Sequence, residues 1–290
     1  MLTRPNCKIN IGLNILRRRP DGYHDLQTIF YPIPLTDELE ITPMDTPKGA
    51  KPTVVLTCQG IPIPSPDGDN LCVKAFHLLC DIFPGRLTSI SLRLQKSIPF
   101  GAGLGGGSAD ASFTLRMLND LFHLGLSPQE LRPLAARLGA DCPFFIDNRP
   151  AIATGIGDIL TPIQLDLSAY RIVLIKPSDS VGTREAYAHV HPTPATPDLA
   201  HFIQQPPEKW KGTIINDFEA SVFPAHPKIA QLKQKLYDYG AIYASMTGSG
   251  AAVYGLFPKD FDYDPIRTAL SSIASLSYYI LPLPPTCEGC

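Results

Sequence analysis

A glycine-rich segment, PFGAGLGGGSADAS at residues 99–112, constrains the fold of this chain more than any other feature. Five of the seven positions from 101 to 107 are glycine, and a segment with helical apolar spacing follows. Glycine adopts backbone conformations that other residues avoid, and it lets main-chain N–H groups approach an anion closely. The unpaired N–H groups of a helix's first turn add a second attraction. The segment therefore predicts a phosphate-binding loop that leads into a helix, with Ser108 as the helix cap or as a ligand to phosphate or magnesium.

Other glycine-rich motifs fit this segment poorly. Walker A needs a lysine directly before Ser or Thr, whereas here Gly107 precedes Ser108. The dinucleotide spacing G-x-G-x-x-G does begin at Gly101, but that motif needs a buried strand before it and an acidic residue after a second strand. The preceding residues alternate as a half-exposed antiparallel strand does, and a second helix follows the first. Protein-kinase signatures are absent. A structural turn with a helix cap remains the plain alternative.

The composition predicts a globular protein with neither a polyanionic partner nor a membrane span. The chain has 290 residues, of which 44% are apolar, and a net charge of −2. This length can bury a large core, and the small charge gives no indication of nucleic-acid binding. The apolar runs at 172–175 and 278–283 are strand-sized and too short to cross a bilayer. Lys8 interrupts the N-terminal apolar residues, so we expect no signal sequence.

Cysteine use predicts a reducing compartment. Seven cysteines, an odd number dispersed along the chain, suggest free thiols and a cytoplasmic location. Cys287 and Cys290 form a C-x-x-C pair, but a zinc site would need two further ligands. We expect a disordered tail there and no metal site built from protein ligands.

The first half of the chain combines strand and helix patterns. Apolar and polar residues alternate over 9–15, which predicts a strand with one apolar and one polar face. Lys8 and Asn10 then point the same way. Helices are expected from Asn70 to about Phe83, from Ser108 onward, and from a capping box at Ser127 and Glu130 to a stop at Gly139.

The second half predicts a different arrangement. In order, we expect a strand at 170–176, a helix from about Thr183, a proline-rich excursion loop at 191–212, a helix at 226–240, strands at 242–246 and 251–257, a helix at 263–275 and a last strand at 277–283. This order is close to the split βαβ, ferredoxin-like arrangement. The fold class is therefore α+β, with a domain boundary near residue 160, after the turn-rich ATGIGD segment.

Three further clusters accompany the glycine-rich segment: PNCKINIGLNILRRRPDGYHDLQTIF at 5–30, GADCPFF at 139–145 and SMTGSGAAVYGLF at 245–257. Together they resemble the signature segments of the galactokinase, homoserine kinase, mevalonate kinase and phosphomevalonate kinase superfamily. P-x-K-I-N, R-R-x-D-G-Y-H and G-A-D-x-P-F-F further resemble the 4-diphosphocytidyl-2-C-methyl-D-erythritol kinase family, over about residues 4–283. Cys7 and Ser112 replace usual alanines and Thr247 replaces a usual serine, without removing a group that the reaction needs.

The resemblance implies a two-domain small-molecule kinase fold. An N-terminal ribosomal-protein-S5-domain-2-like domain, residues 1–160, would bind ATP, and a ferredoxin-like domain would form residues 161–290. The implied reaction moves the γ-phosphoryl group of ATP to the 2-hydroxyl of the methylerythritol portion, in non-mevalonate isoprenoid (terpenoid) biosynthesis. By resemblance, Asp141 accepts the hydroxyl proton and Lys8 lies beside it. A cation there favours the charged carboxylate and offsets growing negative charge on the transferred group.

The resemblance also implies the binding residues. ATP, with Mg²⁺ as its counter-ion, would be held by Pro99, Phe100, Gly101, Ala102, Gly103, Leu104, Gly105, Gly106, Gly107, Ser108 and Ala109. The cytidine-diphosphate substrate, a small molecule, would be held by Asn10, Tyr23, His24, Tyr187, Gly248, Ser249 and Gly250. His24 would pair with the cytosine edge, because stacking alone does not discriminate between bases.

Each of these residues also has a plain structural interpretation. Taken alone, Asp141 is a helix N-cap, Lys8 a solvated lysine on a strand, and the D-G-Y-H segment a polar turn. Gly248–Gly250 is a tight hairpin turn in the same sense. A kinase for mevalonate-type or homoserine-type alcohols, a regulatory nucleotide-binding protein and a dehydrogenase are the other functions that the sequence leaves open. The oligomeric state is not predicted.

Overall fold

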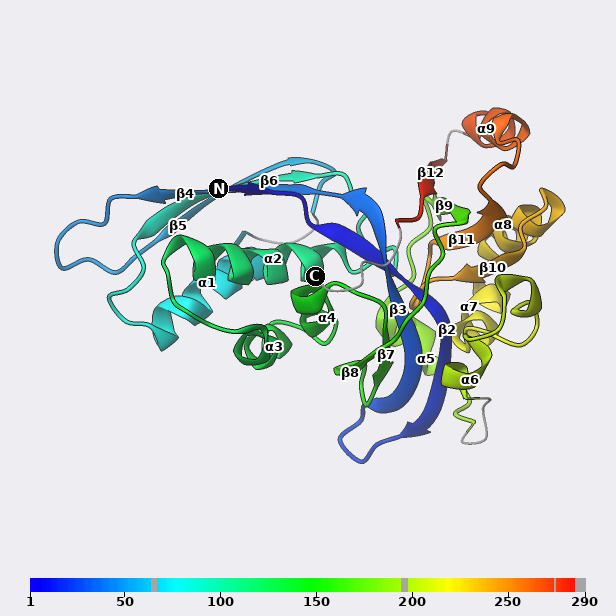
Figure 1. Ribbon diagram of the computed structural model, residues 1–290, viewed down its shortest axis with the longest axis horizontal. Helices are drawn as coiled ribbons and strands as arrows, with labels where there is room; N and C mark the ends of the chain where they lie inside the picture. Colours follow the sequence, from blue (N-terminus) through cyan, green and yellow to red (C-terminus); the bar gives the residue numbers. More distant parts are fainter. Residues whose placement is uncertain (64–66, 194–197, 274, 285–290) are drawn as a thin grey trace. The chain divides into compact units, whose positions relative to one another are not determined.

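The computed structural model describes residues 1–63, 67–193, 198–273 and 275–284, and the chain folds as two compact units (Figure 1). Unit 1 comprises Met1–Cys7, Leu35–Phe100 and Gly105–Asn148, and unit 2 comprises Lys8–Pro34, Gly101–Leu104 and Arg149–Cys290. Each unit has its own apolar core. The domain boundary near residue 160 stays a prediction, and the Cys287/Cys290 pair lies outside the described residues.

Unit 1 is a four-stranded sheet with helices packed on it. Its elements are β1 (Leu2–Thr3), β4 (Glu38–Met44), β5 (Val54–Gly60), η1 (Asp67–Asp69), α1 (Leu71–Ile82), β6 (Ser89–Lys96), α2 (Gly106–Leu121), α3 (Pro128–Ala136) and α4 (Cys142–Asp147). The strand order is β1-β4-β6-β5. β6 pairs antiparallel with β4, as expected, but parallel with β5 on its other side, which the sequence did not predict.

The helix starts of unit 1 follow local hydrogen bonding. Asn70 caps α1 by accepting a hydrogen bond from the Cys72 N–H (2.9 Å), as predicted. The predicted capping box also forms at α3, where Glu130 accepts a hydrogen bond from the Ser127 N–H (2.9 Å). α3 ends at Ala136, three residues before the glycine expected to stop it.

The start of α2 corrects one prediction. The N-cap is Gly105, in the left-handed conformation with φ +70°, and the helix begins at Gly106. Ser108 is therefore inside the first turn and does not cap the helix. Glycine reaches this conformation without steric cost, so the helix can begin earlier than a serine-based rule predicts.

Unit 2 holds two four-stranded sheets. Its elements are β2 (Asn6–Arg18, whose first two residues belong to unit 1), β3 (His24–Thr36, whose last two belong to unit 1), β7 (Ala151–Thr154), β8 (Ile159–Pro162), β9 (Tyr170–Pro177), α5 (Thr183–Ala188), α6 (Leu199–Phe202), η2 (Pro207–Lys209), α7 (Phe218–Ala225), α8 (Pro227–Asp238), β10 (Tyr243–Met246), β11 (Val253–Pro258), α9 (Asp264–Ser271) and β12 (Leu276–Pro282). One sheet has the order β2-β3-β7-β8 and the other β10-β11-β9-β12.

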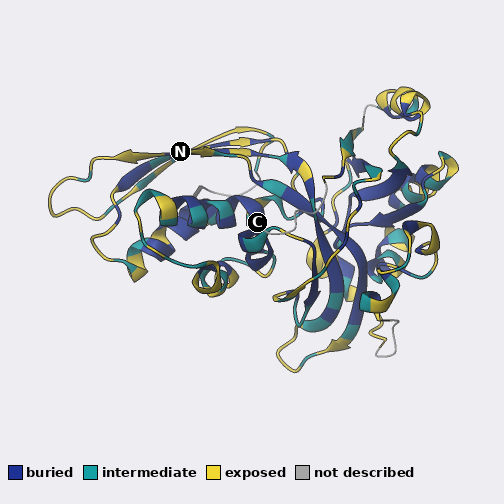
Figure 2. Ribbon diagram, in the orientation of Figure 1, coloured by how far each residue is buried: buried dark blue, intermediate teal, exposed yellow. Residues whose placement is uncertain are grey.

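The second sheet confirms the ferredoxin-like prediction. In chain order its strands are β9, β10, β11 and β12, all neighbours are antiparallel, and the first and third lie together in the middle. Buried residues fill β9, β10 and β11 (Figure 2). Leu13 and Ile15 of β2 and Leu26 of β3 pack into the same core, so these two N-terminal strands are joined to the C-terminal half of the chain.

Two segments of unit 2 differ from expectation. The 191–212 region is more than an excursion loop: it contains α6 and η2, and Leu199 and Trp210 are both buried to 1% exposure. The helix α7 was not predicted, because Pro224 lies inside it and polar residues precede it. No helix within the described ranges is both long and apolar enough to cross a membrane.

Candidate active site

The polar face of β2 is buried, which rejects the solvated-lysine interpretation of Lys8. Lys8 and Asn10 are 3% and 2% exposed, and the Lys8 Nζ donates a hydrogen bond to the Asn10 Oδ1 (2.6 Å). The Asn10 Nδ2 donates to the Thr28 Oγ1 (2.9 Å), which donates to the Gly12 carbonyl (2.6 Å). Buried polar groups are costly unless they are hydrogen-bonded. This chain of bonds therefore fixes the side-chain positions of Lys8 and Asn10.

Asn10 is also tied to the glycine turn between β10 and β11. The Asn10 N–H donates to the Thr247 Oγ1 (3.0 Å), and the Thr247 hydroxyl lies 3.2 Å from the Gly103 carbonyl. A Cβ atom at Gly103 would lie 2.1 Å from the Thr247 carbonyl oxygen. The first half of the glycine-rich loop thus packs backbone to backbone against this turn, and only glycine fits.

The turn at Gly248–Gly250 is both a hairpin turn and a stretch of backbone without side chains beside Asn10. It joins β10 to β11 as an antiparallel hairpin, with Met246 opposite Val253, which is the plain structural interpretation. Gly248 has φ +55°, and a Cβ there would lie 3.2 Å from the Gly103 Cα. The hairpin therefore presents bare backbone beside Asn10.

The second half of the glycine-rich segment belongs to unit 1 and opens α2. Gly105 has no side chain to cap the helix, so its first-turn N–H groups are directed at the space before the helix. Gly107 is exposed, and nothing lies within 4 Å of a Cβ built on it. Ala102, Leu104 and Ala109 are buried at 2%, 1% and 0% exposure, so these residues pack into the protein interior. Phe100, by contrast, is 56% exposed.

A buried charge cluster, which we did not predict from the sequence, supports the start of α2. The Lys96 Nζ donates hydrogen bonds to Asp37 and to the Asp110 Oδ2, the latter at 2.7 Å. Asp37 also accepts the Ser97 and Ile98 N–H groups (2.6 and 2.8 Å). Burial raises the pKa of Asp110 to about 7, against the lowering effect of Lys96. Burial lowers the pKa of Lys96, but the two carboxylates outweigh it and the pKa is raised.

Asp141 lies at the start of α4 in unit 1. It is half-buried and occupies the N-cap position with helical backbone angles, but its side chain does not cap the helix. The Ser112 hydroxyl of α2 donates to the Cys142 carbonyl (2.8 Å) and so links the two helices. Burial raises the pKa of the Cys142 thiol to about 11, which leaves it protonated at neutral pH. Lys8 belongs to unit 2, so its pairing with Asp141 stays a prediction.

Two residues predicted to contact a nucleoside lie together in unit 2. The His24 ring, at the start of β3, stacks on the Tyr187 ring of α5, with centroids 4.7 Å apart and planes 19° apart. Tyr187 in turn meets the edge of Phe218 at 4.8 Å. Burial, and then the charge of Arg18, lower the pKa of His24. A neutral imidazole offers one hydrogen-bond donor and one acceptor, and these groups can form hydrogen bonds with the edge of a base.

The D-G-Y-H segment is also a well-formed turn. The Arg19 N–H donates to the Tyr23 carbonyl (2.7 Å), the Asp21 carboxylate accepts the Tyr23 N–H (3.1 Å), and Gly22 has φ +87°. The turn leaves the Tyr23 side chain 61% exposed. The plain interpretation of the segment as a turn is correct. The turn ends next to His24, so Tyr23 directly precedes one of the two stacked rings.

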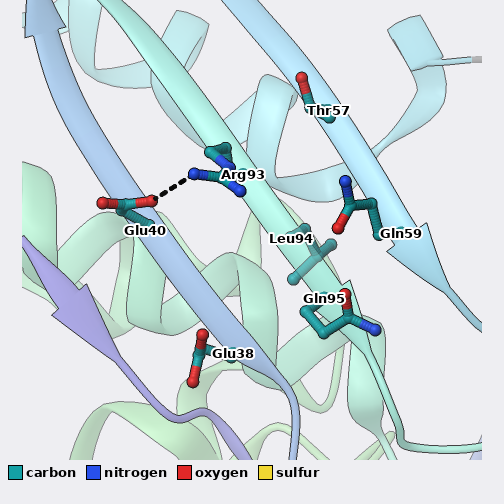
Figure 3. Close-up of a pocket in the computed structure, with 7 residues that line it drawn as sticks. All are labelled: Glu38, Glu40, Thr57, Gln59, Arg93, Leu94 and Gln95. Carbon is teal, nitrogen blue, oxygen red and sulfur yellow. Dashed lines mark hydrogen bonds and ion pairs between the residues drawn. The ribbon is translucent and has the colours of Figure 1, made fainter.

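Two cavities have other lining residues. One, of about 220 Å³, is a polar groove on the sheet of unit 1 that Glu38, Glu40, Thr57, Gln59, Arg93, Leu94 and Gln95 line (Figure 3). Arg93 and Glu40 pair across it at 3.4 Å. The other, of about 600 Å³, is lined by residues of 211–215, α7, α8 and β10. Neither contains a predicted site residue. Among the residues that the structure describes, no three His, Cys, Asp or Glu side chains converge as metal ligands.

The comparisons agree with this arrangement. The family model for the GHMP kinases N terminal domain matches residues 70–149, and that for the GHMP kinases C terminal matches residues 201–274. The chain is 50% identical over 260 residues to a 4-diphosphocytidyl-2-C-methyl-D-erythritol kinase of Bacteroides fragilis, covering 90% of this chain and 93% of that protein. A relative of the same name from Salinibacter ruber is 38% identical and covers 96% of this chain and 97% of its own length.

Solved structures give the same result for the fold. A crystal structure of 4-(cytidine 5'-diphospho)-2C-methyl-D-erythritol kinase superposes with a TM-score of 0.79 at 31% identity, over 97% of this chain and 99% of that chain. A mevalonate kinase, 13% identical, superposes with a TM-score of 0.70 over 99% of this chain and 100% of that one, which is a likeness of fold alone. The predicted α+β, two-domain small-molecule kinase fold is confirmed.

Proposed function

We propose that this chain, which belongs to the 4-diphosphocytidyl-2-C-methyl-D-erythritol kinase family of the GHMP kinases, transfers the γ-phosphoryl group of ATP to the 2-hydroxyl of 4-diphosphocytidyl-2-C-methyl-D-erythritol. The product is the 2-phosphate, an intermediate of non-mevalonate isoprenoid biosynthesis. The observation that carries the choice of acceptor is the stack of His24 on Tyr187. A mevalonate-type or homoserine-type alcohol has no base for such a site to recognise.

ATP, as its magnesium complex, is proposed to bind along residues 99–109. The first-turn N–H groups of α2 and the helix dipole attract phosphate oxygens, and the open space at Gly107 lets them approach the backbone. Magnesium dehydrates reluctantly and often keeps water and substrate phosphates as ligands. We therefore assign it no set of protein ligands. Ser108 is the first residue of α2 that carries a side chain, and its hydroxyl is the protein group that we propose nearest to the phosphates.

The acceptor is proposed to bind through residues of unit 2. Tyr23, His24 and Tyr187 would hold the cytidine end, and Asn10 and the Gly248, Ser249 and Gly250 backbone would hold the remainder. The turn supports this role because it exposes backbone beside a fixed Asn10. Neutral His24 would pair with the cytosine edge, which its lowered pKa favours.

The chemical step is proposed to rely on Asp141 and Lys8. As the acceptor oxygen forms its bond to the γ-phosphorus, Asp141 takes the hydroxyl proton, and the bond from that phosphorus to the bridging oxygen breaks, so that ADP leaves with the electron pair. Lys8 offsets negative charge on the transferred group. Phosphoryl transfer depends mostly on such positioning and charge stabilisation, and the hydrogen bond from Lys8 to Asn10 holds the lysine in place.

ADP release tests this proposal. The purified chain is incubated with magnesium, ATP and 4-diphosphocytidyl-2-C-methyl-D-erythritol, beside Asp141→Asn and Asp147→Asn. Asp147 is the matched control, because it lies in the same short helix but pairs with Arg132 at 2.7 Å. We expect acceptor-dependent ADP release that falls by roughly 10²–10⁴-fold in D141N and stays near wild type in D147N.

Each other outcome has a distinct meaning. Wild-type turnover that survives in D141N would keep the reaction but reject Asp141 as the proton acceptor. No turnover with this acceptor, but turnover with mevalonate or homoserine, would reject the acceptor itself. We also propose a cytoplasmic location, which is consistent with free thiols at Cys72, Cys80 and Cys142.

A further inference from the structure

The segment Asn216–Glu219, just before and within the start of α7, touches the glycine turn but has no assigned role. Asn216 is 2% exposed. Its Nδ2 donates to the carbonyls of Met246 (2.9 Å) and Gly248 (2.8 Å), and its Oδ1 accepts the Phe218 N–H (3.0 Å). Both amide donors and the acceptor are used, so the side chain has one orientation; the flipped amide would face two carbonyls with an oxygen.

The same segment is fastened to β2. The Leu13 N–H donates to the Ile215 carbonyl (2.9 Å), and the Asp217 N–H donates to the Leu13 carbonyl (2.8 Å). The Asp217 carboxylate also accepts the Ile15 N–H (2.7 Å). Asn216 therefore stands on a base fixed to the strand that carries Lys8 and Asn10.

Glu219 holds the same end of the turn, at the last residue of β10. Its Oε1 accepts the Met246 N–H (2.8 Å), and its Oε2 accepts a hydrogen bond from the Lys233 Nζ (2.6 Å). Met246 is thus held at its N–H by Glu219 and at its carbonyl by Asn216. The turn begins from a fixed point.

The bond from Asn216 to the Gly248 carbonyl determines where the next N–H points. In a trans peptide the C=O and N–H groups point in opposite directions. Because the Gly248 carbonyl faces Asn216, the Ser249 N–H is directed away from it. Within the described part of the chain, this N–H donates no hydrogen bond, while the Gly250 N–H is used by the Thr247 carbonyl (3.0 Å). Ser249 is half-exposed.

We propose that Asn216 is a positioning residue that aims the Ser249 N–H at the diphosphate of the acceptor. The inference rests on the proposed function, because it takes a cytidine diphosphate as the ligand of this turn. Glycines at 248 and 250 give the turn little stiffness of its own, so an outside side chain is needed to hold one peptide plane. Loss of a hydrogen bond to a charged group weakens binding about 10-fold or more.

The test separates the diphosphate from the nucleoside by titrating CDP and cytidine calorimetrically. The variants are Asn216→Ala and the isosteric Asn216→Asp, whose carboxylate would face the two carbonyls. The matched control is Asn119→Ala in unit 1, where Asn119 makes two similar backbone bonds to Leu126 (3.1 and 2.8 Å). Asn216→Ser, which keeps one hydroxyl donor, replaces N216A if that variant does not fold.

We expect N216A and N216D to weaken CDP binding about tenfold or more, to leave cytidine binding within about twofold, and to raise the KM of the acceptor more than they lower kcat. N119A should lower thermal stability without changing the ratio of CDP to cytidine affinity. Equal losses for CDP and cytidine, or no change in either, would overturn the role of Asn216 while the proposed function stands. If the wild type binds neither compound, the proposed acceptor class fails and this inference with it.

Discussion

Replacement of Gly103 by alanine should destabilise unit 2 far more than the same replacement at Gly101. Both glycines have positive φ, +73° and +61°, so alanine costs each about 1–2 kcal/mol of backbone strain. At Gly101 a Cβ meets nothing within 4 Å, whereas at Gly103 it would lie 2.1 Å from the Thr247 carbonyl oxygen. Relief requires a backbone shift of about 1 Å, which breaks the contact of the Thr247 hydroxyl with the Gly103 carbonyl. A buried polar group left unsatisfied costs about 1–3 kcal/mol more.

The assay is urea unfolding followed by the fluorescence of Trp210. It is the only tryptophan in the chain, it is buried in unit 2, and its indole N–H donates to the Gln205 carbonyl (2.7 Å). We expect the free energy of unfolding to fall by about 1–2 kcal/mol in G101A and by about 2–5 kcal/mol in G103A. Equal losses in the two variants would refute the argument that close backbone approach, rather than φ alone, selects glycine at 103.

Three further predictions concern other parts of the site. Gly107→Ala should raise the free energy of unfolding by about 0.5–1 kcal/mol, because the position is helical and nothing lies within 4 Å of the added Cβ. The same change should raise the KM of ATP at least about tenfold, because the Cβ would occupy the space proposed for phosphate. An unchanged KM would show that phosphate does not need this space. Asp110→Asn should flatten the pH dependence of stability measured in urea titrations. Because burial raises the pKa of Asp110 to about 7, the stability that this carboxyl contributes is fully present below about pH 4 and is lost as pH rises through about 7; an unaltered pH dependence in the variant would reject this. Because burial lowers the pKa of His24, the KM of the acceptor should rise as pH falls below about 6.5, and His24→Gln should remove that rise; a rise that persists in the variant would assign it to another group.

Local signals predicted much of the secondary structure. Asn70 and the Ser127–Glu130 box begin helices through hydrogen bonds to residues two or three positions away. A short stretch of sequence is therefore enough to predict these helix starts. The ferredoxin-like order followed from strand and helix patterns in the same way. The start of α2 was misplaced because a glycine in the left-handed conformation caps it without any side-chain signal.

Features that depend on distant residues were not predictable from one sequence. Lys96 lies 59 residues from Asp37 and 14 from Asp110, and nothing local indicates that they share one buried cluster. The segment at Asn216 was assigned no element, and its side-chain bonds to the Met246 and Gly248 carbonyls join residues about 30 positions apart. The burial of Lys8 had the same origin, since alternation predicts a polar face but not what covers it.

The recruitment of β2 into the core of unit 2 has a consequence for the order in which the protein is made. Leu13 and Ile15 of β2 leave the ribosome among the first residues, but their partners Val173, Phe218 and Val253 are made only after most of the chain has been translated. Until then this apolar strand is uncovered, and contacts across such sequence separations form slowly. The nascent chain therefore depends on late translation to protect the strand that carries Lys8 and Asn10, and a fragment ending near residue 160 would keep its apolar side exposed.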